Sequence, residues 1–304
     1  MFSILRSSIA ISLLVSASCF PSPREDAAEP AVPSGWSIYP TPKAPNDALN
    51  CANYSELEWR IVSANGSVKI ERLPQFNGKF RDGDKPLPFR LKQERGMIGD
   101  RRTLKIRGGW LLGFDAGEFG GGLWWSNDDG SISRKLLDHN IRGIISTSPI
   151  LILADAPLRR GAREKGSDGN TVDDPLSGLR SSGEIFAISE DNGESMHLIA
   201  NLDGMPQTFV QESDNFILVT TETGVFRVNP NGAVEALAHG LFWGVYPNSM
   251  AISHDGTIYI GMRMFVVRLI PQSGGYTEEW LLPNECRSFK IRDMECACRG
   301  NGKP

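Results

Sequence analysis

The sequence has few of the residues that signal catalysis, metal binding or nucleic-acid binding. Only four of its 304 residues are histidine. None of them makes an HxxxH or similar spacing, so a histidine metal site is not indicated. No Gly-x-Ser-x-Gly motif occurs, which removes the nucleophile elbow of the α/β-hydrolases. There are 32 basic against 36 acidic residues, so the basic excess of a general nucleic-acid binder is missing and no such partner is expected.

Long apolar runs and helical patterns are also scarce. After the N-terminus no apolar run approaches the roughly 18 residues of a membrane span. No stretch of ten or more residues repeats its apolar positions with a helical period, so little helix is expected. Glycine and proline are plentiful instead, at 32 and 19 residues, and 40% of the chain is hydrophobic. The composition therefore predicts a turn-rich chain that can bury a substantial core.

The N-terminus has the layout of an export signal. Residues 1–18 carry one charge, Arg6, followed by the apolar stretch Ile9–Val15 and small residues, as in a secretory signal peptide. Cys19 comes next, and this junction resembles the lipobox of bacterial lipoproteins, in which the cysteine becomes lipidated. Residues 19–50 are Pro-rich and polar at first, as a tether would be. We expect an exported chain, periplasmic or anchored to a membrane only through that lipid, with secretion as the alternative.

The other cysteines are even in number if Cys19 carries lipid. Four thiols suit two disulfides in an oxidising compartment. The four are Cys51, Cys286, Cys296 and Cys298. They allow three connectivities, among which the sequence does not choose. A link from Cys51 to Cys296 or Cys298 would join the two ends of the folded region, whereas Cys296-Ala297-Cys298 could instead form a metal or redox site.

A repeated hairpin organises the rest of the chain. Five segments share an apolar or aromatic pair, alternating residues, a Gly-containing turn and a second alternating strand. They are 58–73, 123–137, 185–199, 225–238 and 265–281. Their aromatic or apolar anchors are 65, 62, 40 and 40 residues apart. The two long gaps contain insertions at about 74–102 and 156–182, and subtracting these gives a period near 40.

A second pair of strands lies between successive hairpins. The pairs are 103–106 with 110–114, 142–146 with 150–154, 208–212 with 216–221, and 249–253 with 257–261. Four short antiparallel strands in about 40 residues are the pattern of a β-propeller blade. The sequence therefore predicts an all-β fold with four complete blades between about Thr103 and Pro283.

The two remaining hairpins suggest how the ring closes. One lies near the N-terminus at 58–73 and the other at 287–298. Sharing them in one blade would remove the open sheet edges and give a monomeric five-bladed propeller over residues 51–304. A six-bladed ring is the alternative, and it would need hidden strands in 36–50 or 74–102.

The unusual loops gather on one face of such a ring. Loops after the second and fourth strands of each blade share a face, and both insertions and two further loops fall there. The candidate binding residues on this face are Asp115, Glu118, Phe119, Phe242, Trp243, Tyr246 and Asn248. The aromatic residues suit a flat ligand, a sugar or a peptide, or they pack between blades. Asp115 and Glu118 could bind a cation or act as an acid–base pair.

Residues 247–260, PNSMAISHDGTIYI, resemble the repeat of the NHL and gluconolactonase-like (regucalcin-type) propellers. In the lactonase branch the Asn of one such repeat helps to hold a central metal, so the resemblance implies Asn248 as a candidate ligand of a divalent cation. Ser249 stands where that repeat has Gly, and no second Pro-Asn repeat or matching ligand Glu is visible. We therefore expect a binding module for a protein, peptide or glycan, without a cofactor. The alternative is a metal-dependent hydrolase or lactonase that uses Asn248 with Asp115 or Glu118 at the channel mouth.

Overall fold

The computed structural model describes residues 31–41, 57–64, 67–73, 87–92, 94–155, 159–160, 179–180, 182–191, 195–241, 246–284, 288–291 and 294–297. These residues form β-strands joined by turns and loops, with one short 3₁₀ helix, η1 (Gly117–Phe119). The all-β prediction is confirmed for this part of the chain. Within it, no helix has the length and apolar character needed to cross a membrane.

Three four-stranded antiparallel sheets and one five-stranded sheet follow one another along the chain, and the four consecutive strands of each are called a blade below. Blade one contains β4 (Asp100–Ile106), β5 (Gly109–Asp115), β6 (Gly121–Ser126) and β7 (Ser133–Leu137). Blade two contains β8 (Ile141–Ile145), β9 (Ile150–Asp155), β12 (Ser182–Ile188) and β13 (Met196–Asp203). Blade three contains β14 (Pro206–Ser213), β15 (Phe216–Thr221), β16 (Gly224–Val228) and β17 (Val234–His239). Blade four contains β18 (Ser249–Ile252), β19 (Ile258–Gly261), β20 (Val266–Gln272) and β21 (Gly275–Pro283). The four complete blades predicted from the repeat are confirmed.

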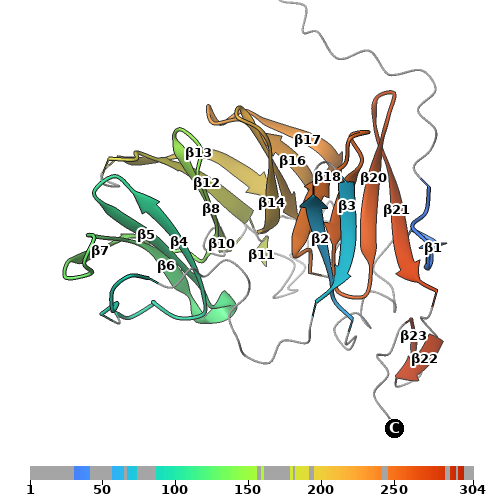
Figure 1. Ribbon diagram of the computed structural model, residues 1–304, viewed down its shortest axis with the longest axis horizontal. Coiled ribbons are helices and arrows are strands. Elements are labelled where there is room, and N and C mark those ends of the chain that lie inside the picture. The colour runs from blue at the N-terminus through green and yellow to red at the C-terminus, as the bar shows by residue number, and fades with distance from the viewer. Residues whose placement is uncertain are drawn as a thin grey trace, which may run out of the picture.

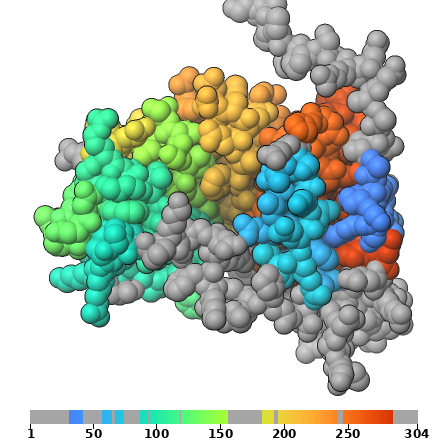
Figure 2. Space-filling view, viewed as in Figure 1, coloured from blue at the N-terminus to red at the C-terminus, as the bar shows by residue number. Residues whose placement is uncertain are grey.

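The blades fan out around a common axis, as in a propeller (Figure 1). The first strand of each blade is innermost, and β4, β8, β14 and β18 contact one another in that order. The hairpin of β2 (Trp59–Ala64) and β3 (Ser67–Arg72) continues the series, because β2 contacts β18. Figure 2 shows blade one at one end and the β2–β3 hairpin packed on blade four at the other.

The predicted shared blade is not among the observed strand pairings. The hairpin β2–β3 and the C-terminal hairpin of β22 (Ser288–Ile291) and β23 (Met294–Ala297) are separate two-stranded sheets in the described part of the chain. The ring of paired strands is therefore open between the two ends, and closure by a fifth blade stays a prediction. A further two-residue pair, β10 (Arg159–Arg160) with β11 (Leu179–Arg180), lies within the second predicted insertion.

Blade four gains a fifth strand from the segment expected to be a tether. The short strand β1 (Trp36–Tyr39) pairs with the outer edge of β21, with Trp36 opposite Pro283. The Trp36 ring packs edge-on against Trp59, with 4.8 Å between ring centroids. Trp36 and Tyr39 supply apolar surface that a solvated tether would leave exposed, which explains why these four residues join the sheet.

The second half of the first insertion covers one face of blade one. Leu87, Leu91 and Met97 pack with Leu112, Phe114 and Trp124 of β5 and β6. Glu94 accepts hydrogen bonds from Trp124 Nε1 at 3.2 Å and from Ser133 Oγ at 2.5 Å. This stretch therefore belongs to the core and does not form a solvated loop.

Glycines allow neighbouring blades to approach closely. A Cβ on Gly113 of β5 would lie 2.6 Å from Ile141 Cγ2, and one on Gly143 of β8 would lie 2.5 Å from Phe209 Cε1. Such distances leave no room for a side chain, so these two positions require glycine for blade packing.

Candidate functional site

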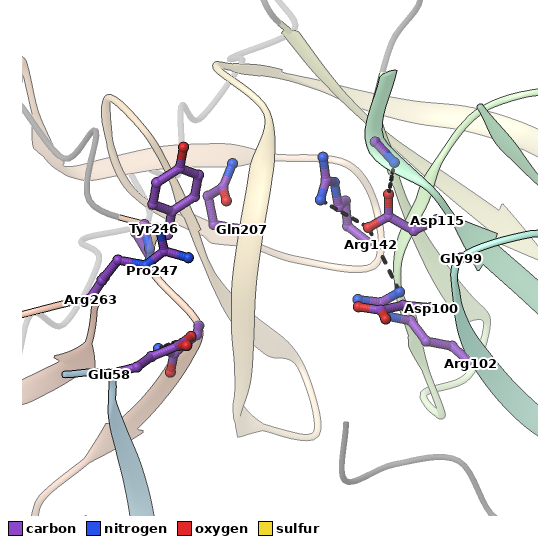
Figure 3. Close-up of a pocket in the computed structure, with 12 residues that line it drawn as sticks. Glu58, Gly99, Asp100, Arg102, Asp115, Arg142, Gln207, Tyr246, Pro247 and Arg263 are labelled. Atoms are coloured by element: carbon purple, nitrogen blue, oxygen red, sulfur yellow. Dashed lines mark hydrogen bonds and ion pairs between the residues drawn. The ribbon is translucent and has the colours of Figure 1, made fainter. Parts of the chain in front are cut away.

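A polar cavity of about 300 Å³ lies where the inner strands begin, and it is called the axial cavity below (Figure 3). Its lining comes from all four blades and from the start of β2. The lining residues are Glu58, Gly99, Asp100, Arg102, Asp115, Gly117, Arg142, Gln207, Tyr246, Pro247, Asn248 and Arg263. Residues within or just before each innermost strand contribute, so the cavity is the mouth of the channel around which the blades are arranged.

Arg142 of β8 organises one wall of the cavity. Its Nε and Nη2 contact both oxygens of Asp155 at 2.8–3.0 Å, and its Nη1 donates to Asp115 Oδ2 at 2.9 Å. Asp115 Oδ1 accepts from the backbone of Gly117 at 3.0 Å. Asp115 and Asp155 are both buried and are the last residues of β5 and β9, the second strands of consecutive blades. One guanidinium thus pairs with two buried carboxylates and links blade one to blade two.

The charges in this cluster depend on one another. Burial favours the neutral form of Arg142, but the hydrogen bonds and charge of Asp155, together with Asp115, hold the pKa of the guanidinium above its ordinary value. Burial raises the pKa of the Asp155 carboxyl above its ordinary value, and the hydrogen bonds from Arg142 oppose that rise. Both oxygens of Asp115 are already occupied, so this carboxylate is better suited to positioning than to proton transfer or metal binding.

A chain of hydrogen bonds orients the opposite wall. The backbone N–H of Ile61 donates to Ser249 Oγ at 2.8 Å, and Ser249 Oγ donates to Asn248 Oδ1 at 2.7 Å. The amide nitrogen of Asn248 then faces Glu58 and donates to its Oε1 at 3.2 Å. Asn248 therefore presents N–H groups, and not its oxygen, to the nearest carboxylate.

Arg263 and Tyr246 form a second element of that wall. The Arg263 guanidinium lies 4.7 Å from the centre of the Tyr246 ring, a cation–π geometry. Tyr246 has φ +58°, and Met264, next to Arg263, has φ +71°. Among the described residues these are the two non-glycine positions with positive φ, a conformation that costs free energy and clusters at functional sites.

The channel continues below the axial cavity. An adjoining cavity of about 490 Å³ shares Asp100, Arg102, Arg142, Gln207 and Asn248 with it. Four inner strands, β2, β8, β14 and β18, each contribute one apolar side chain to this adjoining cavity. These are Ile61, Ile144, Phe209 and Met250. A charged mouth therefore leads to a partly apolar interior.

The structure brings three of the seven candidate binding residues to the axial cavity. Asp115, Tyr246 and Asn248 line it together, although they are far apart in the sequence. Phe119 lies in η1, 77% exposed, and is not among the lining residues. Phe242, Trp243 and the side chain of Glu118 lie outside the described residues, as do Cys19, Cys51, Cys286 and Cys298. Cys296 lies in β23, of whose side chains nothing is described.

Sequence reasoning missed the charged residues of the inner strands. Asp100 and Arg102 belong to β4, Arg142 to β8 and Gln207 to β14, all near the start of a first strand. Aligning the predicted first strands would have placed these polar residues at equivalent depths. Polar side chains that recur at the start of the innermost strands would therefore have predicted a polar site at this end of the channel.

The chemistry of the axial cavity is that of recognition by mixed charges. Three arginines face three carboxylates among its lining residues. In the described part of the chain no three His, Cys, Asp or Glu side chains group closely enough to hold a metal ion.

Comparisons with known proteins found distant structural similarities only. No family model and no curated protein sequence matches this chain. A gluconolactonase from Xanthomonas campestris is similar with a TM-score of 0.33 and 12% identity, over 72% of this chain and 65% of that one. This chain thus spans just under two thirds of that protein. A virginiamycin B lyase from Staphylococcus aureus is similar with a TM-score of 0.36 and 12% identity, over 82% and 86% of the two chains. Similarity at this level assigns no activity.

Proposed function

We propose that this protein is an exported propeller-type binding module whose ligand site is the axial cavity. The observation that carries the proposal is the structure of that cavity: side chains of both charge signs, oriented by partly buried hydrogen bonds, line a hollow large enough for a small molecule. Ligand sites are concave and present a few placed polar groups. The sequence-based expectation of a protein, peptide or glycan ligand is here narrowed to a small polar molecule, or the polar end of a larger one.

The test is a ligand screen on the purified mature protein and two asparagine variants. The panel contains monosaccharides, dicarboxylates, free amino acids and divalent cations, and the readout is the thermal unfolding midpoint followed by calorimetric titration. We expect a panel member to stabilise the wild type and to lose at least about tenfold in affinity with Asn248→Ala, because a preorganised donor is removed.

Asn215→Ala is the matched control, because Asn215 lies in the turn between β14 and β15, away from the cavity lining. It should bind as the wild type does. Equal loss in both asparagine variants, or no binding by any panel member, would contradict a ligand site in the axial cavity.

The alternative proposal is a metal-dependent hydrolase or lactonase at the same cavity. In its favour, Asn248 and Glu58 lie side by side in the channel mouth. Against it, the Asn248 oxygen is engaged by Ser249, and both oxygens of Asp115 are engaged by other groups. A stoichiometric divalent metal in the purified protein, lost with Asn248→Ala but not with Asn215→Ala, would favour the hydrolase over the binding module.

We further propose that the ring closes as a fifth blade in the exported protein. The organisation proposed is a signal peptide at 1–18, a lipid on Cys19, a tether that ends where β1 begins, and a monomeric propeller to residue 304. The open edges of β2–β3 and β22–β23 support closure, because unpaired strand edges invite aggregation. Peptide mapping without reduction should find Cys51 joined to a C-terminal cysteine. Finding four free thiols would contradict the disulfide-closed ring.

A further inference from the structure

We infer that the ligand of the axial cavity is a small dipolar molecule with an apolar substituent: a free ammonium, a free carboxylate and an apolar side chain. This inference rests on the proposed binding function and names the ligand class. It follows from which polar groups in the cavity remain available, how they are distributed, and what lies beneath them.

Most charges in the cavity are already paired within the protein. Asp115 and Asp155 share Arg142, and Arg102 donates to the carbonyl oxygen of Ile141 at 2.9 Å. Glu58 accepts from Asn248. A ligand need not neutralise these groups, since they are satisfied without it.

Two charged groups on opposite walls are available. The backbone of Asp100 pairs with Asp115, but its side chain makes no hydrogen bond or ion pair with any described residue. The Arg263 guanidinium makes no ion pair with a described carboxylate and lies against the face of Tyr246. In Figure 3 Asp100 lies on the wall with Arg142, and Arg263 lies on the facing wall. Both residues are half-buried, so water can solvate them without a ligand. An anion could pair only with Arg263 and a cation only with Asp100, whereas a dipolar molecule can pair with both.

The positive φ of Tyr246 and Met264 supports Arg263 as a recognition group. Both backbone conformations cost free energy, and they flank the contact between Tyr246 and Arg263. The Met264 loop is fixed to the N-terminal hairpin, because Met264 N–H donates to Leu57 O at 2.8 Å and Trp59 Nε1 donates to Met264 O at 3.0 Å. The guanidinium is therefore preorganised, which reduces the entropy lost on binding.

The apolar substituent follows from the deeper channel. Ile61, Ile144, Phe209 and Met250 line the adjoining cavity, together with polar residues such as Arg60 and Arg101. A molecule whose charged groups engage Asp100 and Arg263 would direct a side chain towards these four residues, and an apolar side chain would bury there most favourably.

Calorimetric titration of the full mature protein tests the inference with L-leucine and L-phenylalanine. The comparison probes are the dipeptide Leu-Leu, N-acetyl-leucine, leucine methyl ester and L-serine. We expect leucine, phenylalanine or Leu-Leu to bind, and the two blocked derivatives and serine to bind at least about tenfold more weakly. Leu-Leu binding more tightly than leucine would identify a peptide end as the source of the dipolar group.

Two charge variants with matched controls complete the test. Arg263→Gln and Asp100→Asn should each weaken binding at least about tenfold while the unliganded melting temperature stays close to that of the wild type. Arg107→Gln and Asp128→Asn, which change exposed ion-paired residues, should bind normally. Equal binding of N-acetyl-leucine and leucine, or no binding by any amino acid or dipeptide, would overturn the inference. If a sugar, dicarboxylate or cation then bound in an Asn248-dependent manner, the proposed binding function would still hold. If no member of the ligand panel bound, both the dipolar-ligand inference and the proposed binding function would be contradicted.

Discussion

Arg142 is the residue on which the axial cavity depends most. It holds two buried carboxylates that end the second strands of consecutive blades. Burying a carboxylate without a partner is costly, so the three side chains stabilise the protein only as a set.

Arg142→Gln should therefore destabilise the protein strongly. Asp155 would stay buried without its cation, and Asp115 would keep only the longer ion pair with Arg102 at 3.9 Å. Loss of one partner of a buried pair costs about 3–5 kcal/mol. The free energy of unfolding, measured by denaturant titration at pH 7, should fall by that amount. Arg107→Gln, which breaks an exposed pair with Asp191, should change it by less than about 1 kcal/mol. Equal effects would contradict the role assigned to Arg142.

The deficit of Arg142→Gln should also shrink as the pH falls. Burial already raises the pKa of Asp155, and removing Arg142 removes the effect that opposes this rise. A carboxyl whose pKa is raised by folding binds a proton more readily in the folded state, so its unfavourable contribution is largest above the folded pKa. Unfolding curves of variant and wild type should converge between pH 7 and the unfolded value of about 3.9. A deficit that grows on acidification would contradict this explanation.

At the scale of elements, close contacts between blades depend on glycine. Gly143→Ala would place a methyl group 2.5 Å from the Phe209 ring, and overpacking of this kind costs about 1–3 kcal/mol. A double-mutant cycle with Phe209→Leu measures the contact, because leucine lacks the ring atoms that clash. The double variant should be more stable than the sum of the single effects predicts. Strict additivity would show that the two positions do not interact.

The Ser249 hydroxyl is one of the groups that attach the N-terminal hairpin to blade four. Ser249→Ala removes the acceptor of the Ile61 amide and the donor to Asn248. We expect a loss of about 1–2 kcal/mol and faster hydrogen exchange at the Ile61 amide. Ser253→Ala, within the hairpin turn of the same blade, should leave that amide protected. Unchanged exchange in Ser249→Ala would contradict the attachment.

The elements themselves were predictable because their signals are local. Alternating residues and Asp-Gly or Asn-Gly turns specify a hairpin within about 15 residues. Each of the eight strands predicted in pairs between the hairpins overlaps an observed strand, and none extends more than one residue beyond it. The contact between Arg142 and Asp115 was not predictable in this way, because it depends on how blade one packs on blade two. Likewise β1 was not predicted, because four residues are too few to show a clear alternation of apolar and polar positions.

At the scale of the whole molecule, the lipid proposal predicts location. Cys19→Ala, expressed in a bacterium that processes lipoproteins, should move the protein from the membrane to the soluble fraction, because the acyl chains that bind the bilayer are lost. Fractionation followed by immunoblotting measures this, and Cys51→Ala is the matched control that should remain with the membrane. Retention of Cys19→Ala in the membrane would contradict a lipid anchor.

The overall architecture was predictable from the repeat, whereas its closure depends on contacts between the chain ends. Four blades of one period can be counted along the sequence. Whether 58–73 and 287–298 share a sheet depends on pairing across more than 200 residues, for which no local pattern exists. The axial cavity was unpredictable for the same reason, because its lining residues come from segments that are far apart in the sequence.

The position of β1 also decides how the molecule would respond to a pull. A load applied from the N-terminal side first reaches the hydrogen bond from Arg268 Nη1 to Ala31 O at 3.2 Å, and then the pairing of Trp36 with Pro283. An antiparallel strand pair loaded at one end opens one residue pair at a time. Release of the four residues of β1 would lengthen the tether by about 14 Å. Blade four keeps its own four strands throughout. Under load, β1 would therefore detach from β21 before the strands that line the axial cavity are disturbed.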